Sequence, residues 1–292
     1  MRGPDAVATA SGAALADVAR ALREGGVAAA GREARLLVQG VVGLSAAELW
    51  TGDRAWPAAA VAKVWDAVER RRRGEPLAYV LGMAAFRTVT LSVNADVLIP
   101  RPETEGLVEH VLRWSARRWG DGPWGSVIDV GTGSGCVALS LAAEGRFATV
   151  IATDVSAAAL RVAGRNVERA GSPPGAHLLR CFLVQGIRPD GVDAVVSNPP
   201  YIATDELARL DRSVRAFEPH EALDGGADGM YHIRALVAAV RSVLRRGGLL
   251  AVEIDAGRAE TALQFARAAG WPDARIEHDV FGRPRYLIST RE

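Results

Sequence analysis

The feature that most constrains the fold of this chain is a glycine-rich turn between a predicted strand and a predicted helix. Val127-Ile128-Asp129-Val130 is an apolar run typical of a buried strand, and Gly131-Thr132-Gly133-Ser134-Gly135 follows it directly. Glycines in such a turn let the backbone bend tightly and approach a ligand closely. From about residue 126 strands and helices alternate, which indicates a parallel sheet covered on both faces. We therefore expect a ligand site at the carboxyl end of this strand.

The remaining strands and helices predict an α/β fold with a Rossmann-like sheet. Helices are expected over 134–143 and 156–170, and strands over 127–130, 149–153, 178–184, 194–197, 249–254, 274–280 and 285–290. Only Phe281-Gly282-Arg283-Pro284 separates the last two strands, so they should form a hairpin in which one strand runs antiparallel. The predicted sheet is mostly parallel, has about seven strands and ends in this antiparallel hairpin.

Residues 1–84 have a different pattern, which predicts a small all-helical domain. Ser11 should cap the first helix, and the second helix should run from about Gly31. Ser45 and Glu48 have the spacing of a capping box, which predicts the start of a third helix. The fourth helix should cover residues 58–73. Residues 86–93 then alternate in polarity before Asn94-Ala95-Asp96 and the apolar run 97–99, which we interpret as a β-hairpin. The predicted organisation is a helical domain (1–84), a hairpin linker (85–99) and a sheet domain (100–292).

Four consecutive arginines, Arg70 to Arg73, raise the question of a nucleic-acid contact. No aromatic residues interleave them, and cations suit the C-terminus of a helix, where they complement its dipole. We interpret this run as a solvated helix end.

Composition excludes several classes of protein. The 292-residue chain has a net charge of +1, so no global field favours a nucleic acid or a membrane surface. Two cysteines, Cys136 and Cys181, make neither a metal set nor a disulfide framework and fit a reducing compartment. The chain shows no signal-peptide pattern and no apolar stretch near the roughly 20 residues of a membrane span. We expect a cytoplasmic protein.

The spacing of the glycines indicates the kind of ligand. A dinucleotide fingerprint would place its third glycine at position 136, which is Cys136 here, so the compact Gly131–Gly135 turn suits an adenosyl group without a pyrophosphate. Asp154 ends the next strand about 20 residues further on, where a carboxylate can accept hydrogen bonds from both ribose hydroxyls. The alternative is a glycine-rich turn beside an unrelated aspartate.

A second unusual segment, Asn198-Pro199-Pro200-Tyr201, directly follows the strand at 194–197. The prolines lack N–H donors and fix their own φ, so the loop is stiff and presents bare carbonyls. The Asn198 amide and the Tyr201 ring would complete a clamp for a planar group that carries an NH₂. A plain Pro-Pro turn is the alternative. Because this strand end opens onto the same crevice as the glycine turn, the two together suggest S-adenosylmethionine and methylation of a planar nitrogen.

Four segments resemble the release-factor glutamine methyltransferases: VLIPRPETEGLVE at 97–109, SNPPYI at 197–202, EPHEALDGGADG at 218–229 and FGRPR at 281–285. The resemblance implies a class I methyltransferase sheet behind a helical substrate-recognition domain. It also implies methyl transfer from S-adenosylmethionine, leaving S-adenosylhomocysteine, to the glutamine amide in the Gly-Gly-Gln loop of class I peptide chain release factors. We expect no metal and a monomer.

Residue roles follow from the resemblance at matching positions. The turn Gly131, Thr132, Gly133, Ser134 and Gly135 would hold the methionine part of the cofactor, and Asp154 and Val155 the ribose side. Asn198 and the Pro199 carbonyl would accept hydrogen bonds from the glutamine NH₂, while Pro200 and Tyr201 pack on the amide plane. An amide nitrogen is a poor nucleophile because its lone pair is delocalised. Two fixed acceptors would aim it and stabilise the positive charge that develops on it.

The chain departs from the family pattern at three places. Phe182 and Leu183 stand where the family has an aspartate and a bulky aromatic that contact adenine; Phe182 could stack on that ring instead. After Glu253-Ile254 the chain has Asp255 and Arg258 in place of a glycine and a glutamine, and Arg35 replaces an acidic residue in the second helix. These departures bear on cofactor affinity and on docking of the partner.

Two other functions remain open from the sequence. One is an amino-methyltransferase that acts on a ribosomal-protein glutamine or on DNA adenine, although a net charge of +1 argues against DNA. The other is a cofactor-binding protein without catalysis, which Phe182 suggests. The intact Asn198–Tyr201 segment argues against that loss of activity.

Overall fold

The computed structural model describes residues 11–51 and 56–292, which form two compact units. The first unit contains the described residues up to Gly82 together with Arg212–Phe217. The second contains Met83–Asp211 and Glu218–Glu292. One short helix, α9 (Arg212–Phe217), therefore belongs with the first unit although the chain on both sides of it belongs to the second.

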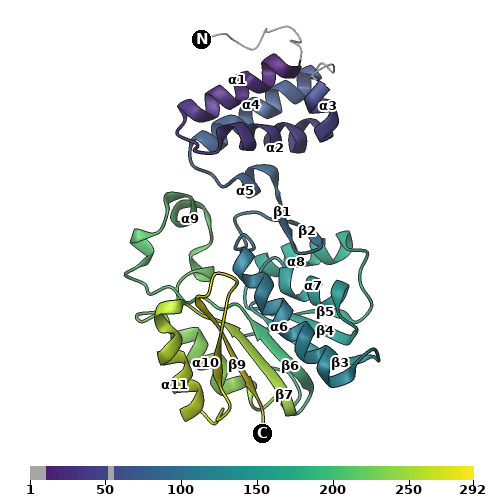
Figure 1. Ribbon diagram of the computed structural model, residues 1–292, viewed down its shortest axis with the longest axis vertical. Coiled ribbons are helices and arrows are strands. Elements are labelled where there is room, and N and C mark those ends of the chain that lie inside the picture. Colours follow the sequence, from purple (N-terminus) through teal and green to yellow (C-terminus); the bar gives the residue numbers. More distant parts are fainter. Residues whose placement is uncertain (1–10, 52–55) are drawn as a thin grey trace. The chain divides into compact units, whose positions relative to one another are not determined.

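The first unit is helical, as predicted, and its elements are α1 (Ser11–Glu24), α2 (Ala30–Val42), α3 (Ala46–Thr51), α4 (Ala58–Arg72) and α5 (Leu77–Leu81), with α9 added (Figure 1). Their apolar faces share one core, which includes Leu22 from α1, Leu37 from α2 and Val64 from α4. The predicted capping box is confirmed, because the Ser45 backbone N–H donates to the Glu48 carboxylate over 2.8 Å and Glu48 N–H donates to Ser45 Oγ over 3.2 Å. The side chain of Ser11, the other predicted cap, lies outside the described residues.

The arginines at the end of α4 are held by carboxylates of their own unit. Arg70 pairs with Glu75 at 2.5 Å, Arg71 with Glu33 at 2.6 Å, and Arg72 with Glu69 at 2.7 Å. These ion pairs within one unit favour a structural role for Arg70, Arg71 and Arg72 over contact with phosphates.

The second unit contains a seven-stranded sheet of the predicted type. Its strands are β3 (Trp124–Val130), β4 (Phe147–Asp154), β5 (Ala176–Arg180), β6 (Val192–Ser197), β7 (Leu244–Glu253), β8 (Arg275–His278) and β9 (Pro284–Thr290), in the order β5-β4-β3-β6-β7-β9-β8. Strand β9 pairs antiparallel with both β7 and β8, and the other pairs are parallel. The sheet order reverses between β3 and β6, so the strand ends that carry the glycine turn and Asn198 are adjacent.

Alternation along the strands divides the core into two layers. Ile128, Val195 and Leu250 belong to the cluster under α10 (Tyr231–Val240) and α11 (Ala259–Ala268). Their sequence neighbours point to the opposite face, which is covered by α6 (Pro102–Trp119), α7 (Cys136–Glu144) and α8 (Ala157–Arg169) (Figure 1). Strands buried on both faces explain why these runs are continuously apolar.

The hairpin differs from the prediction in its position. It consists of β1 (Met83–Phe86) and β2 (Val89–Ser92), with its turn at Arg87, whose φ is +48°. Residues 97–99 form no strand, because the N–H of Ile99 donates to the buried Glu218 carboxylate over 3.1 Å and not to a neighbouring strand. Phe86 and Leu91 pack in the core beneath α6 and α7, so the hairpin packs as part of the second unit.

The predicted strand at 178–184 is also displaced. Strand β5 ends at Arg180, and the Cys181 N–H donates to the carbonyl of Asp154, the last residue of β4. Beyond that point β4 offers no further partner, so 182–186 form turns in which Leu183 has a φ of +53°. The apolar character of Leu183 and Val184 reflects packing against the sheet core and not strand pairing.

Short 3₁₀ turns complete the described chain: η1 (Leu207–Arg209), η2 (His220–Ala222) and η3 (Ala256–Arg258). None of the helices within residues 11–51 and 56–292 combines the length and apolarity that crossing a membrane requires.

Candidate functional site

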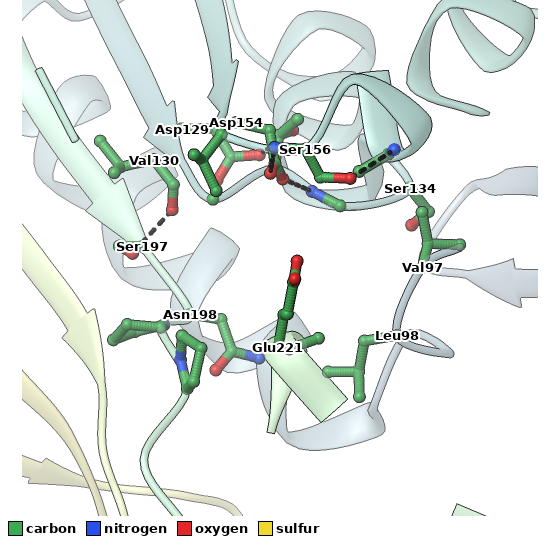
Figure 2. Close-up of a pocket in the computed structure, with 18 of the residues that line it drawn as sticks. Val97, Leu98, Asp129, Val130, Ser134, Asp154, Ser156, Ser197, Asn198 and Glu221 are labelled. Carbon is green, nitrogen blue, oxygen red and sulfur yellow. Dashed lines mark hydrogen bonds between the residues drawn. The ribbon is translucent and has the colours of Figure 1, made fainter. Parts of the chain in front are cut away.

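A cavity of about 380 Å³ lies in the second unit at the carboxyl ends of β3, β4 and β6 (Figure 2). It falls in the volume range typical of cofactor sites. Its wall includes residues 131–134 of the glycine turn, 154–156 after β4, and Asn198–Pro200 after β6. The structure thus brings the two segments that the sequence singled out to one cavity.

The glycine turn presents its backbone to this cavity. Gly131, Gly133 and Gly135 have φ values of +73°, +55° and +84°, in the left-handed region that disfavours a Cβ. The N–H groups of Gly131 and Thr132 both donate to the Thr153 carbonyl over 2.9 Å, which ties the turn to β4. A Cβ added at Gly131 or Gly133 would meet nothing within 4 Å, so the space in front of the turn is open to a ligand.

A buried carboxylate supports the turn from behind. One oxygen of Asp129 accepts hydrogen bonds from Thr132 Oγ1 over 2.6 Å and from the Ala138 N–H over 3.1 Å. Burial raises the pKa of Asp129 to about 7, and the two hydrogen bonds oppose that rise. Asp129 therefore fixes the turn against the start of α7.

Asp154 stands at the end of β4, as predicted, on the cavity wall. Its Oδ2 accepts the Gly133 N–H and its Oδ1 accepts the Ser156 N–H, each over 2.9 Å. Each oxygen keeps acceptor capacity beyond that single backbone bond. Val155 follows with 58% of its surface exposed. This arrangement matches what the two hydroxyls of a ribose require.

The part of the cavity wall that follows β5, next to Asp154, is apolar. Phe182 lines it with 38% of its surface exposed, and Leu183 lies beside it, held by a hydrogen bond from Thr153 Oγ1 to the Leu183 carbonyl. The exposed ring of Phe182 offers a flat face to a planar base. The open glycine turn, the Asp154 carboxylate and this ring together fit an adenosyl cofactor.

Asn198 closes the other side of the cavity (Figure 2). Its Nδ2 donates to Thr104 Oγ1, at the start of α6, over 3.0 Å. Its Oδ1 accepts no hydrogen bond from the described residues, so the amide carbonyl is available to a ligand. Ser197 fixes the strand end below it by donating to the Val130 carbonyl over 2.7 Å.

Two predicted site residues lie behind the cavity wall and not on it. Gly135 is the N-cap of α7, and its φ of +84° is a backbone conformation that favours glycine, while a Cβ there would make an ordinary contact of 3.5 Å with that of Ala163. The Tyr201 ring packs against the core, and its hydroxyl donates to Glu253 Oε1 over 3.2 Å. Burial, together with the negative Glu253, raises the pKa of Tyr201.

The segment after Pro200 is anchored by close backbone contact. Ile202 forms a bridge with Asp224, and the Gly225 N–H donates to the Ile202 carbonyl over 2.7 Å. A Cβ at Gly225 would lie 2.8 Å from Tyr201 Cα, so only glycine permits this approach. Residues 223–226 therefore support the loop that carries Asn198.

Several residues of the site were not predicted. Thr104 and the fully buried Glu253 connect to Asn198 and Tyr201. The Glu221 carboxylate points into the cavity (Figure 2), and His232 on α10 also lines it, where burial lowers its pKa. Thr104 and Glu221 stand in segments already quoted for their resemblance, but only the fold shows their contacts.

A buried carboxylate also orders the cavity rim. Glu218 accepts the N–H of Ile99 and, over 2.6 Å, a hydrogen bond from the Arg101 guanidinium. Ile99 and Arg101 belong to the segment that leads into α6, and Glu218 belongs to the segment after the Asn198 loop. The pairing explains in physical terms why two distant stretches of sequence act as one wall.

The departures after β7 contact one another. Asp255 accepts the Gly257 N–H at the start of η3, and Arg258 donates to Asp255 over 2.9 Å. Arg258 also pairs with Glu206 at 2.7 Å and donates to the Asp228 carbonyl. The substituted pair therefore links the chain after β7 to the loop beyond Asn198. Arg35 lies exposed on α2, where its Nε donates to the Gly31 carbonyl.

Within the described residues, no group of three or more histidine, cysteine, aspartate or glutamate side chains could hold a metal ion. Burial raises the pKa of Cys136 to about 12, so this thiol is neutral.

Comparisons with known proteins agree with this architecture. A family model described as the PrmC N-terminal domain matches residues 13–82, and one described as the methyltransferase small domain matches residues 116–214. A release factor glutamine methyltransferase of Caulobacter vibrioides is 35% identical over 92% of this chain and 92% of its own length. Its counterpart from Moorella thermoacetica is 38% identical over 95% of this chain and 97% of its own length.

Among solved structures, the hMettl16 catalytic domain superimposes with a TM-score of 0.55 at 16% identity, covering 80% of this chain and 81% of that one. At this identity the likeness concerns the fold alone. The identity and coverage of the full-length relatives are sufficient to assign the family. This chain belongs to the release factor glutamine methyltransferases, a family of S-adenosylmethionine-dependent enzymes.

Proposed function

We propose that this protein transfers a methyl group from S-adenosylmethionine to the side-chain amide nitrogen of the glutamine in the Gly-Gly-Gln loop of class I peptide chain release factors. The observation that carries the proposal is the Asn198 amide at the cavity, whose Nδ2 donates to Thr104 while its Oδ1 has no partner among residues 11–51 and 56–292. An acceptor in that position suits an incoming NH₂ group. Family membership supports a release factor as the substrate.

Each side of the cavity has its own task. The open turn at 131–134, Asp154 and Phe182 would hold the cofactor, which when bound supplies an electrophilic methyl group. Asn198 Oδ1 and the Pro199 carbonyl would accept the two amide N–H bonds of the substrate. Proline has a fixed φ, which holds the Pro199 carbonyl in place, and it has no N–H that could compete for an acceptor at this point. Pro200 lines the cavity and would contact the amide plane.

The two acceptors, Asn198 Oδ1 and the Pro199 carbonyl, would compensate for the low nucleophilicity of an amide nitrogen. Holding both N–H bonds orients the nitrogen toward the methyl group and removes much of the entropic barrier. The same two oxygens stabilise the positive charge that develops on nitrogen in the transition state. Tyr201, which we predicted to pack on the amide, would act from behind the loop through its contact with Glu253.

One assay tests the proposal. The protein is incubated with radiolabelled S-adenosylmethionine and, separately, a class I release factor, its Gln→Ala loop variant, a ribosomal-protein substrate and duplex DNA. We expect label on the wild-type factor only. Label on DNA or on the ribosomal protein would assign a different acceptor, and cofactor binding without any transfer would mean a non-catalytic protein. Gel filtration of the same sample tests the expected monomer.

A further inference from the structure

Asn198 is the cavity end of a hydrogen-bond chain that runs into the protein core. Thr104 Oγ1, which accepts the Asn198 NH₂, itself donates to Glu253 Oε2 over 2.7 Å. Glu253 is fully buried at the end of β7, and its other oxygen accepts the Tyr201 hydroxyl. One buried carboxylate thus holds two hydroxyls, and both of them lead to the Asn198–Tyr201 loop.

The chain has a direction that follows from counting protons. A threonine hydroxyl has one proton, and Glu253 accepts it, so toward Asn198 the Thr104 oxygen can only accept. An NH₂ group must then face Thr104, and the Asn198 carbonyl must face the other way. If the Thr104 proton were not bound to Glu253, the Asn198 amide could flip and exchange its oxygen and nitrogen, because the Thr104 hydroxyl could then donate to the oxygen or accept from the NH₂. Its NH₂ would then oppose the NH₂ of a substrate.

We propose that Thr104 and Glu253 are positioning residues that fix the orientation of the Asn198 amide, so that its carbonyl oxygen faces the acceptor nitrogen. This inference rests on the proposed function, since orientation matters only if Asn198 receives an N–H donor. Thr104 lines the cavity and Glu253 does not, and each contacts the Asn198–Tyr201 loop through a hydrogen bond. They act through Asn198, and through Tyr201 on the far side of the loop.

The charge of Glu253 bears on this role because an ionised carboxylate only accepts, whereas a neutral one can donate to Thr104 and reverse the chain. Burial raises the pKa of Glu253 to about 7, while the bonds from Thr104 and Tyr201 and the nearby Arg285 oppose the rise. The titratable groups around this carboxylate are Glu103 on α6, Cys136 on α7, Tyr201, and Arg285 and Tyr286 on β9. Assays at about pH 8 keep Glu253 mainly ionised.

The test compares Thr104→Val with Thr104→Ser. Valine keeps the shape of threonine and removes the hydroxyl, whereas serine keeps the hydroxyl. We expect Thr104→Val to lower kcat for the release factor by about 10- to 100-fold, as loss of an orienting partner typically does, with KM changed less than about threefold. Thr104→Ser should retain kcat within about threefold of the wild type.

Ser115→Ala is the matched control, because Ser115 lies buried on the same helix and its hydroxyl has no hydrogen-bond partner in the described chain. It should leave kcat unchanged. Glu253→Gln, which replaces an acceptor by a group that can also donate, should lower kcat while the cofactor Kd, measured by titration calorimetry, stays within about threefold. Thermal melts confirm that each variant is folded.

Three results would overturn the inference: wild-type kcat in Thr104→Val, an equal loss in Thr104→Ser, or a loss confined to cofactor binding. A readout independent of any substrate is the side-chain NH₂ signal of Asn198 in NMR spectra, assigned by its absence from Asn198→Ala. We expect Thr104→Val to speed its hydrogen exchange and Thr104→Ser to preserve it. No methyl transfer by the wild type would contradict the proposed function, while the NMR comparison would still decide the orientation.

Discussion

The two sides of the cavity differ in that one is formed mainly by backbone and the other by side chains. On the cofactor side the ligand would face the open backbone of a turn whose glycines have positive φ, together with one carboxylate, Asp154, from the adjacent strand. On the acceptor side the position of one side chain, Asn198, depends on other side chains, Thr104 and Glu253. The first side is local in sequence, whereas the second spans 149 residues.

This difference suggests that one side of the cavity contributes to binding and the other to the transition state. Backbone groups in a stiff turn hold a ligand in the same way throughout a reaction, so they contribute mainly to binding. An amide carbonyl that meets an N–H as charge develops on nitrogen contributes mainly to the transition state. Changes on the cofactor side should therefore raise the cofactor Kd, and changes on the acceptor side should lower kcat.

The largest effect is expected from Asn198→Ala, which removes the side-chain acceptor. We expect kcat to fall by at least about 100-fold, comparable to the loss of one oxyanion-hole donor. The cofactor Kd should stay within about tenfold, since the lost contact is mainly with the substrate. Steady-state kinetics and calorimetry on the same protein measure both quantities. Turnover at the wild-type rate would rule out the proposed mechanism.

Asp154→Ala should produce the opposite pattern. The variant loses the acceptors proposed for the ribose and the bond to the Gly133 N–H. We expect the cofactor Kd to rise by about 10- to 100-fold, which corresponds to hydrogen bonds with a charged group. The transfer rate at saturating cofactor should remain within about fivefold of the wild type. An unchanged Kd would remove Asp154 from the cofactor site.

A smaller effect on the same side is expected from Phe182→Ala. Loss of a stacking face should raise the cofactor Kd by about three- to tenfold. Phe281→Ala provides a control, because Phe281 is 73% exposed at the tip of the β8–β9 hairpin and does not line the cavity. If Phe182→Ala and Phe281→Ala bind the cofactor equally well, the adenine contact must come from other residues.

The smallest effect concerns Asp129, whose pKa rises from 3.8 to about 7 on folding. Between those values the folded protein binds more protons than the unfolded chain, so this stabilisation is complete below pH 3.8 and is lost as the pH rises to about 7. In Asp129→Asn an oxygen remains to accept from Thr132 and Ala138, but nothing titrates. Relative to that variant, the wild-type free energy of unfolding should fall by about 1 kcal/mol per pH unit between about pH 5 and 7.

Urea denaturation of both proteins across this pH range measures the difference. Other titrating groups, including Glu253, are common to the two chains and cancel in the comparison. Parallel stability curves would mean that Asp129 is ionised in the folded protein throughout this range.

The cofactor side of the cavity could be predicted better than the acceptor side, because its residues form local patterns in the sequence. The glycine turn and the end of β4 are local patterns, so Gly131 and Asp154 were found from the sequence. The alternation of strands and helices also predicted the sheet, and the short connection at 281–284 predicted its antiparallel ending. The strand predicted at 178–184 was misplaced because apolar residues in a packed turn have the same composition as a strand.

The supports of the acceptor side could not be predicted in this way. Nothing in the spacing of Thr104, Glu218 or Glu253 indicates their contacts, since each contact joins segments far apart in the sequence that only the fold brings together. The family resemblance marked the segments around Thr104 and Glu218 but not their hydrogen bonds. Likewise, Asp255 and Arg258 are separate departures in the sequence and become one ion pair only in the fold.

One side of the cavity would hold the cofactor, and the other would promote transfer. The most direct test is single-turnover methyl transfer to the release factor by Asp154→Ala and Asn198→Ala over a range of cofactor concentrations. We expect Asp154→Ala to approach the wild-type rate at saturation, while Asn198→Ala stays at least about 100-fold slower at every concentration. Recovery of both variants at saturation, or of neither, would contradict this assignment of the two sides.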